Sequence, residues 1–246
     1  MAEFTIKIAG QAGRVVSLFD SSRDYCRKYL TEDTPAFFVT VSRGDLTFEQ
    51  ESLLEEARQE GIRPRRFPDP FLERAAIQRK FAEHLLTCGT LMLHGSTVAV
   101  DGNAYLFTAS CGTGKSTHTR LWRETFGDRA VMVNDDKPFL RVTENRALAC
   151  GAPWSGKHGL DSNVALPLQG ICILRRGAEN RIRRIQPGDA MEMLLHQSYA
   201  PLDASNLPGH RRLVASLAAA VPLWQMDCTK DPEAAAIAYA AMSRRP

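Results

Sequence analysis

The chain has 246 residues, 44% of them hydrophobic and 24% charged, an ordinary composition for a soluble globular protein. That length buries one sizeable core, or one core with a small appendage. A formal net charge of +3 without a polybasic block argues against a nucleic-acid partner, and no apolar run approaches the roughly 20 residues that span a membrane.

The six cysteines show neither a CxxC pair nor the spacing of metal ligands, so we expect them to be reduced and mostly buried. The N-terminal segment lacks the charged start and apolar run of a signal peptide. Together these features predict a cytoplasmic protein without a membrane partner. They leave open whether the chain forms a homo-oligomer.

Residues 1–66 are predicted to form a small α+β appendage. Three strand-like runs, FTIKIAG, RVVSLF and AFFVTVS, alternate with polar and glycine-bearing segments. Thr47 and Gln50 fit a capping pair at the start of a helix that Gly61 ends. The appendage either docks a partner or covers a sheet edge, and the second is the simpler interpretation.

Residues 67–246 are predicted to form the main domain. Two prolines in FPDP break the chain at its start, and apolar residues at helical spacing predict a helix over 71–86. Asp101-Gly102 then separates two alternating runs, LMLHGSTVAV and AYLFT, and is a strong signal for a two-residue hairpin.

The hairpin register determines the position of His94. If Asp101 and Gly102 form the turn, His94 lies opposite Ala109, beside the mouth of the glycine-rich loop that follows. A shift by one residue leaves it there. The alternative is that His94 is an ordinary core histidine.

The glycine-rich loop, residues 109–116, matches the phosphate-binding pattern of Gly, any four residues, Gly, Lys and Ser or Thr, except that Ala109 replaces the first glycine. Glycines let backbone N–H groups turn toward phosphate oxygens, and the helix beginning near Lys115 directs its positive dipole end there. We expect ATP here, with Lys115 neutralising the outer phosphates and Ser116 ligating Mg²⁺. The predicted nucleotide-binding residues are Ser110, Cys111, Gly112, Thr113, Gly114, Lys115, Ser116 and Thr117.

A second apolar run, residues 130–133, ends in Asn134-Asp135-Asp136. A carboxylate at the end of such a strand is suited to hold the metal of a nucleotide. The alternative is a buried strand with a polar end. Adjacent strand residues point to opposite faces, so Asp135 and Asp136 are expected to have different roles.

The sequence predicts a further hairpin before residues 151–163, a loop of small, glycine-rich and polar residues around Trp154. Such a loop is able to close over a ligand, and Lys157 would then bring a positive charge to the transferring phosphoryl group. The alternative is a surface loop anchored by Trp154. Downstream, the pattern predicts a core strand ending in Arg175-Arg176, helices over 189–197, 208–219 and 232–242, and a strand over 221–226.

Four segments carry a resemblance: His94-Gly95, SCGTGKST, VNDD and PWSG. The first three resemble the catalytic core of the HPr kinase/phosphorylase family and, more distantly, ATP-dependent phosphoenolpyruvate carboxykinase. PWSG resembles a loop of HPr-kinase-related small kinases. The resemblance covers about residues 90–176. It implies an α/β fold with a P-loop on a mixed sheet, preceded by a histidine-bearing strand and followed by an aspartate pair.

The resemblance also implies a function, namely an ATP- and Mg²⁺-dependent kinase acting on a hydroxyl of a small metabolite such as serine, or of a peptide or protein. It implies that Asp135 is the general base, Asp136 supports Mg²⁺ and His94 orients the phosphate or the base, with Lys115 and Lys157 supplying charge. The residues alone leave the two aspartate roles exchangeable. Two other functions stay open: a carboxykinase-like lyase acting on oxaloacetate, and a nucleotide-binding regulator without turnover.

Overall fold

The computed structural model describes residues 1–59, 61, 63–110 and 112–244. The chain forms two compact units, Met1–His84 and Leu85–Pro246. Each unit has its own sheet, and the two are described separately.

The first unit contains a three-stranded sheet in the order β1-β2-β3. Strands β1 and β2 are antiparallel, whereas β2 and β3 are parallel. Its elements are β1 (Ala2–Ile8), β2 (Gln11–Ser17), α1 (Ser21–Tyr25), the 3-10 turn η1 (Arg27–Tyr29), β3 (Phe37–Thr40), α2 (Arg43–Gln59) and most of α3 (Asp69–Thr87).

Helix α2 begins at Arg43, earlier than predicted, because a different pair of residues caps it. The Ser42 N–H donates to Asp45 Oδ2 at 2.9 Å, and the Asp45 N–H donates to Ser42 Oγ at 3.3 Å. The predicted capping pair of Thr47 and Gln50 is wrong. Both lie inside the helix, and Gln50 binds the backbone of the segment after it.

Helix α3 determines where the first unit ends. The predicted boundary falls after Arg66, whereas the contacts divide the chain after His84. The reason is that α3 packs on β3: the Phe81 ring contacts Phe37 at 4.9 Å between centroids, and His84 stacks on Phe37 at 3.7 Å. A break such as FPDP ends a helix, but it does not tell which sheet the next helix packs against.

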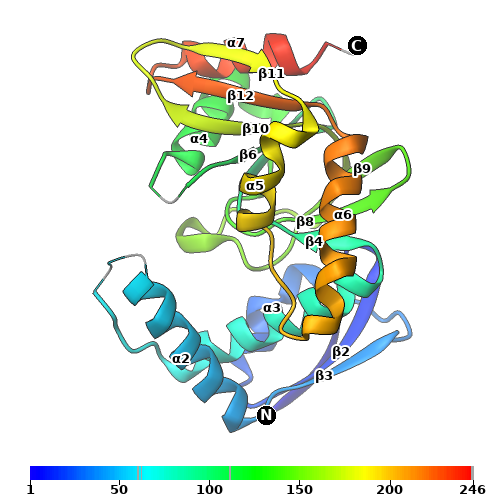
Figure 1. The fold of residues 1–246 in the computed structure, drawn as a ribbon. Helices are drawn as coiled ribbons and strands as arrows, with labels where there is room; N and C mark the ends of the chain where they lie inside the picture. The colour runs from blue at the N-terminus through cyan, green and yellow to red at the C-terminus, as the bar shows by residue number, and fades with distance from the viewer. Residues whose placement is uncertain (60, 62, 111, 245–246) are drawn as a thin grey trace. The chain divides into compact units, whose positions relative to one another are not determined.

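The second unit contains a nine-stranded sheet, which confirms the predicted mixed α/β architecture. Seven strands follow the order β4-β8-β9-β10-β6-β5-β7, and β12 and β11 continue from β10 (Figure 1). The strands are β4 (Thr90–Met92), β5 (Ser96–Val100), β6 (Asn103–Thr108), β7 (Ala130–Asn134), β8 (Phe139–Thr143), β9 (Arg146–Cys150), β10 (Ala165–Arg176), β11 (Arg181–Arg184) and β12 (Leu223–Cys228). The helices are α4 (Lys115–Phe126), α5 (Pro187–Gln197), α6 (Leu207–Ala220) and α7 (Glu233–Met242), with 3-10 turns η2 (Gly127–Arg129), η3 (Gly156–His158) and η4 (Ala204–Asn206).

The predicted hairpin is confirmed in β5 and β6. Asp101 and Gly102 have φ angles of 51° and 78°, the left-handed conformations that a two-residue hairpin turn needs. Val100 pairs with Asn103 as predicted, and the ladder ends at Ser96 opposite Phe107. The predicted run LMLHGSTVAV is not one strand, because β4 at its start pairs with β8 and His94 lies between β4 and β5.

Four strand ends meet at one edge of this sheet. Strand β10 runs parallel to β6 and β12. Strand β5 is antiparallel to both β6 and β7, so β7 also runs in the direction of β6. The carboxyl ends of β6, β7, β10 and β12 therefore lie together, and ligands of open α/β sheets bind at such an edge.

Helices cover both faces of the sheet. Ile171 and Ile173 of β10 join the core beneath α5 and α6, whereas Cys172 and Leu174 join the core beneath α4 and α7. Figure 1 shows these two helix pairs on opposite sides of β10. The alternation follows from the strand period of two, and the apolar run of β10 reads as continuous because both of its faces are buried.

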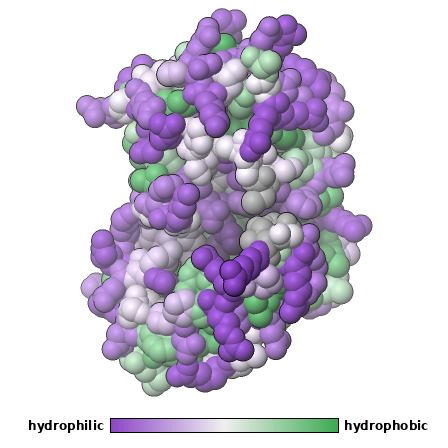
Figure 2. Space-filling model, turned by 90° about the vertical axis from the view of Figure 1, so that its left-hand side faces the viewer, coloured by the Kyte–Doolittle hydropathy of each residue, from purple (hydrophilic) through white to green (hydrophobic). Residues whose placement is uncertain are grey.

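Most side chains on the face shown in Figure 2 are hydrophilic, with hydrophobic ones scattered between them. Such scattered apolar residues are normal on protein surfaces. Among the residues that the structure describes, no helix is long and apolar enough to cross a membrane.

Candidate functional site at the carboxyl edge of the sheet

The glycine-rich loop follows β6 and ends where α4 begins at Lys115. Gly112 and Gly114 have φ angles of 72° and 117°, so both positions favour glycine, and Gly114 is the N-cap of α4. The first turn of a helix has backbone N–H groups without intrahelical partners, which is what an anion needs. Cys111, predicted to bind nucleotide, lies outside the described residues.

Two cationic side chains hold the loop. Lys115 Nζ donates to the carbonyl oxygen of Ala109 at 3.1 Å, across the loop from its own position. Arg176, at the end of β10, donates through Nη2 to the carbonyl oxygen of Gly112 at 2.7 Å. Both cations therefore contact the backbone of the glycine-rich loop.

Asp135 is buried and connected to the first turns of α4. Ser96 Oγ donates to Asp135 Oδ1 at 2.8 Å and lies 2.7 Å from Thr119 Oγ1. Thr119 follows Ser116 by about one helical turn, so both residues share a face of α4. The chain of hydroxyls places Asp135 on the side of the site where Ser116 lies in the first turn of α4.

Asp136 lies beside His94 and remains partly exposed. His94 Nε2 is 3.3 Å from Asp136 Oδ1, and the side chains are 38% and 32% exposed. Burial raises the pKa of Asp136, but the hydrogen bond from His94 and the charges of Lys137, His94 and Lys115 outweigh it, so the pKa is below its ordinary value. His94 therefore contacts a carboxylate of the site and is not merely a core residue.

The backbone fixes the position of His94. Its N–H donates to the carbonyl oxygen of Gln197 at 2.7 Å, and its carbonyl oxygen accepts from Thr108 Oγ1 at 2.9 Å. Thr108 is the last residue before the glycine-rich loop, and Gln197 is the last residue of α5. His94 is thus held between the loop and the end of α5.

Asn134 organises the segment that carries both carboxylates. Its Oδ1 accepts from the N–H groups of Asp136 at 2.9 Å and Lys137 at 2.7 Å. Its Nδ2 donates to the carbonyl oxygens of Ala152 at 2.8 Å and Trp154 at 3.2 Å. One fully buried side chain therefore joins the aspartate pair to the loop of residues 151–163.

Within that loop, Trp154 is 5% exposed and contacts Phe139 edge to face. It anchors the loop, which is the simpler of the two predicted roles. Gly156 has a φ of 65°, and a Cβ at this position would lie 3.2 Å from Asp136 Cβ. Lys157 follows Gly156 on the same turn and is exposed.

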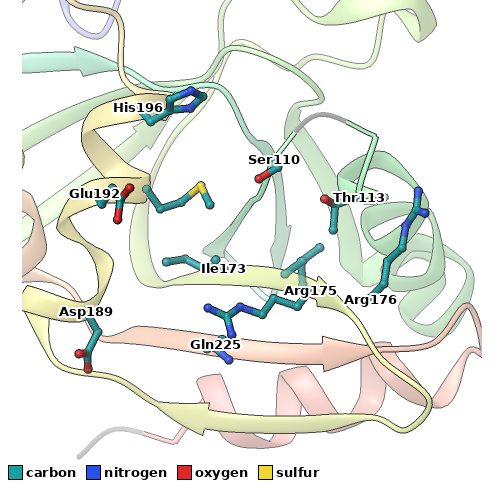
Figure 3. Close-up of a pocket in the computed structure, with 11 residues that line it drawn as sticks. Ser110, Thr113, Ile173, Arg175, Arg176, Asp189, Glu192, His196 and Gln225 are labelled. Carbon is teal, nitrogen blue, oxygen red and sulfur yellow. The ribbon is translucent and has the colours of Figure 1, made fainter. Parts of the chain in front are cut away.

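Two cavities flank the glycine-rich loop. The first, of about 580 Å³, lies between the loop, the end of β10 and helix α5 (Figure 3). The second, of about 560 Å³, extends along α4 past Thr117, His118 and Leu121 to residues 228–231 after β12. Thr113 and Arg176 border both cavities.

A Mg²⁺ ion that arrives with a nucleotide needs only one or two protein oxygen ligands, since phosphates and water supply the rest. Ser116 is exposed at the start of α4, and Asp135 lies on that side of the site. Among the residues described, no group of three or more His, Cys, Asp or Glu side chains is gathered for a metal ion. The oxygen atoms of Ser116 and Asp135 are ligands of the kind that Mg²⁺ takes when it is bound with a nucleotide.

His118 supports α4 from the core. Trp122 Nε1 donates to His118 Nε2 at 3.1 Å, and burial lowers the pKa of His118 to about 4 from an ordinary 6.5. The unfolded chain binds this proton more tightly than the folded protein. Stability from this group is therefore complete above about pH 6.5 and is lost as the pH falls toward about 4.

We expect His118→Gln to flatten the pH dependence of the thermal midpoint between pH 6.5 and 4. A glutamine oxygen is able to accept from Trp122 but does not titrate there. The wild type should lose up to about 3 kcal/mol from this group over that range. Calorimetry of both proteins checks this, and parallel curves would contradict the assignment.

The structure brings together most of the predicted site residues: His94, Lys115, Ser116, Asp135 and Asp136 surround one edge of the sheet. Sequence reasoning missed Ser96, Thr119 and Asn134, whose contacts are made across the fold. Two of them have a sequence feature that could have indicated a role. Asn134 is a polar residue at the end of an apolar strand, and Thr119 is a polar residue on the inner face of α4.

Comparison with solved structures gives a distant likeness in fold. No family model matches the chain, and no curated protein matches it. Among solved structures, the chain is similar to the HPr(Ser) kinase/phosphatase from Coxiella burnetii, with 12% sequence identity and a TM-score of 0.36. The likeness covers 62% of this chain and 99% of that one. A likeness of this size carries no conclusion about activity, so the function is argued from this chain's own residues.

Proposed function

We propose that this protein is an ATP-dependent kinase that transfers the γ-phosphoryl group to a hydroxyl. The observation that carries the proposal is the arrangement at one sheet edge: a glycine-rich loop opening a helix, two cations on that loop, and two carboxylates in different surroundings. Phosphoryl transfer needs this combination, because catalysis depends on alignment and charge neutralisation.

The nucleotide has a preferred direction in this site. Loop N–H groups bind the α- and β-phosphates, and the lysine reaches the β- and γ-phosphates. The charge of Lys115 acts on Asp136, so the γ-phosphate would lie toward Asp136 and His94. The nucleoside then points away from them, into the second cavity along Thr117 and Leu121.

We assign Asp135 to the metal and Asp136 to the acceptor, the reverse of the roles that the family resemblance implies. Asp135 is 7% exposed and is linked through Ser96 to Thr119 of α4, the helix that carries Ser116 in its first turn. Asp136 is more exposed and is oriented by His94. A base must reach the proton that it removes, which favours the exposed carboxylate.

In the proposed reaction, the acceptor O–H gives its proton to an Asp136 oxygen while the acceptor oxygen attacks the γ-phosphorus. The bond from that phosphorus to the β,γ-bridging oxygen breaks, and ADP leaves. Lys115 and Arg176 neutralise the charge on the phosphates, and Lys157 approaches from the opposite loop. Ser116 and Asp135 would hold Mg²⁺, which would add positive charge to this neutralisation.

Mass spectrometry of reactions with ATP and Mg²⁺ tests this function. The panel contains hydroxyl compounds, serine-containing peptides and oxaloacetate. A kinase adds one phosphoryl group to a hydroxyl and releases ADP. Phosphoenolpyruvate from oxaloacetate would instead identify a lyase, and bound but unconverted nucleotide with every compound would identify a regulator.

A further inference from the structure

The first cavity has walls of opposite charge. Figure 3 shows Glu192 and His196 on α5 along one side, Ser110 and Thr113 on the glycine-rich loop along the other, and Arg175 on β10 between them. Ile173 lies on the same face of β10 as Arg175, two residues earlier, and gives the floor an apolar part.

Arg175 and Glu192 line one cavity without pairing with each other. In the part of the chain that the structure describes, neither side chain forms an ion pair within 4.0 Å. Asp189, also on this wall, is already used, because its Oδ2 accepts from the Gln186 N–H at the start of α5. A cation and an anion thus face one space from different elements, with room between them.

Residues that line this cavity adjoin residues of the proposed reaction centre. Ser110 of the glycine-rich loop borders it at one side, and His196 borders it at the end of α5. The next residue, Gln197, contacts His196 Nδ1 at 2.9 Å through its side chain, and its backbone carbonyl holds the N–H of His94. A hydroxyl presented from this cavity would approach the γ-phosphate on the side where Asp136 lies.

We propose that the first cavity binds the phosphoryl acceptor, and that this acceptor is a small hydroxyl compound carrying both an anionic and a cationic group. Arg175 takes the anionic group, which a carboxylate fits because its two oxygens match the guanidinium. Glu192 takes an ammonium group. Hydroxy amino acids have this chemistry. The inference rests on the proposed kinase function and specifies its substrate class.

Phosphorylation rates with matched acceptors test the charge requirement. Serine and homoserine carry both charges, serine methyl ester lacks the carboxylate, and N-acetylserine lacks the ammonium. We expect kcat/KM to fall about 10-fold or more on loss of either charge, as expected for a lost charge-assisted hydrogen bond. Equal rates with all four, or faster transfer to a serine-containing peptide, would overturn the proposal.

Variants connect each charge to its residue. Arg175→Gln should raise the acceptor KM about 10-fold or more with serine but have little effect with serine methyl ester, and Glu192→Gln should show the same pattern with N-acetylserine. The controls are Arg181→Gln and Glu179→Gln, an exposed pair that does not line this cavity. Thermal midpoints confirm that each variant is folded.

The outcome separates this inference from the function on which it rests. If Arg175→Gln raises the KM for ATP and leaves that of the acceptor unchanged, the cavity belongs to the nucleoside and the inference is overturned while the kinase function stands. If the enzyme phosphorylates only uncharged alcohols, the inference is overturned in the same way and the kinase function stands. If no hydroxyl compound of any kind is phosphorylated, the kinase function itself is contradicted.

Discussion

Asp136→Asn should lower kcat by about 10²- to 10⁴-fold while changing the affinity for nucleotide little. The asparagine has nearly the same shape but cannot accept the acceptor's proton at neutral pH. His94 Nε2, 3.3 Å from Asp136 Oδ1, keeps an oxygen partner in the variant, so the local structure should be preserved. Single-turnover measurements with Mg·ATP check the effect on the chemical step.

Asp135→Asn is the matched control for that experiment. It should raise the Mg²⁺ concentration needed for half-maximal rate, because Asp135 is assigned to the metal. Because the pKa of Asp136 lies below its ordinary value, the wild-type rate should fall only when the pH drops below the ordinary pKa of an aspartate side chain. Full activity in Asp136→Asn, with a loss in Asp135→Asn that added Mg²⁺ does not rescue, would restore the opposite assignment.

Asn134→Ala should have the second large effect, destabilising the second unit by about 3 kcal/mol or more and removing activity. The fully buried amide makes four hydrogen bonds to backbone groups, and alanine leaves those groups without this partner. Each buried group left unsatisfied costs about 1–3 kcal/mol. Denaturant unfolding measures the loss.

Asn145→Ala is the control for this prediction, since Asn145 is exposed in the turn between β8 and β9 and should change stability by less than about 0.5 kcal/mol. Asn134→Asp keeps the shape of the side chain and one acceptor oxygen but replaces the donating amide nitrogen with a second oxygen. Its second oxygen would face the carbonyl oxygens of Ala152 and Trp154, so it should be as damaging as alanine. A stable, active Asn134→Ala protein would contradict the role given to this residue.

Local signals made much of the second unit predictable from sequence. The Asp101-Gly102 turn determined a hairpin register because the side-chain period of a strand is two, and that register placed His94 at the glycine-rich loop. The glycine positions and the start of α4 were predictable because a phosphate-type loop has a fixed spacing.

Contacts between distant segments were not predictable in this way. Ser96, which donates to Asp135, meets Thr119 only because β5 and α4 pack together, and the sequence spacing of neither residue indicates this contact. Strand β11 was missed because it is short and rich in arginine, and its pairing with β12 is what makes it a strand. The first unit's boundary depended on packing of α3 for the same reason.

The thermal midpoint measured with and without Mg·ADP or Mg·ATP tests the central claim, that this loop binds a nucleotide, most directly. A ligand present at 100 times its dissociation constant adds about 2.7 kcal/mol to stability, so the midpoint of the wild type should rise by several degrees. Lys115→Ala should lose most of that rise, because it removes the cation that we propose neutralises the outer phosphates. A wild-type midpoint unchanged at millimolar nucleotide, or an undiminished rise in Lys115→Ala, would contradict a nucleotide site on this loop.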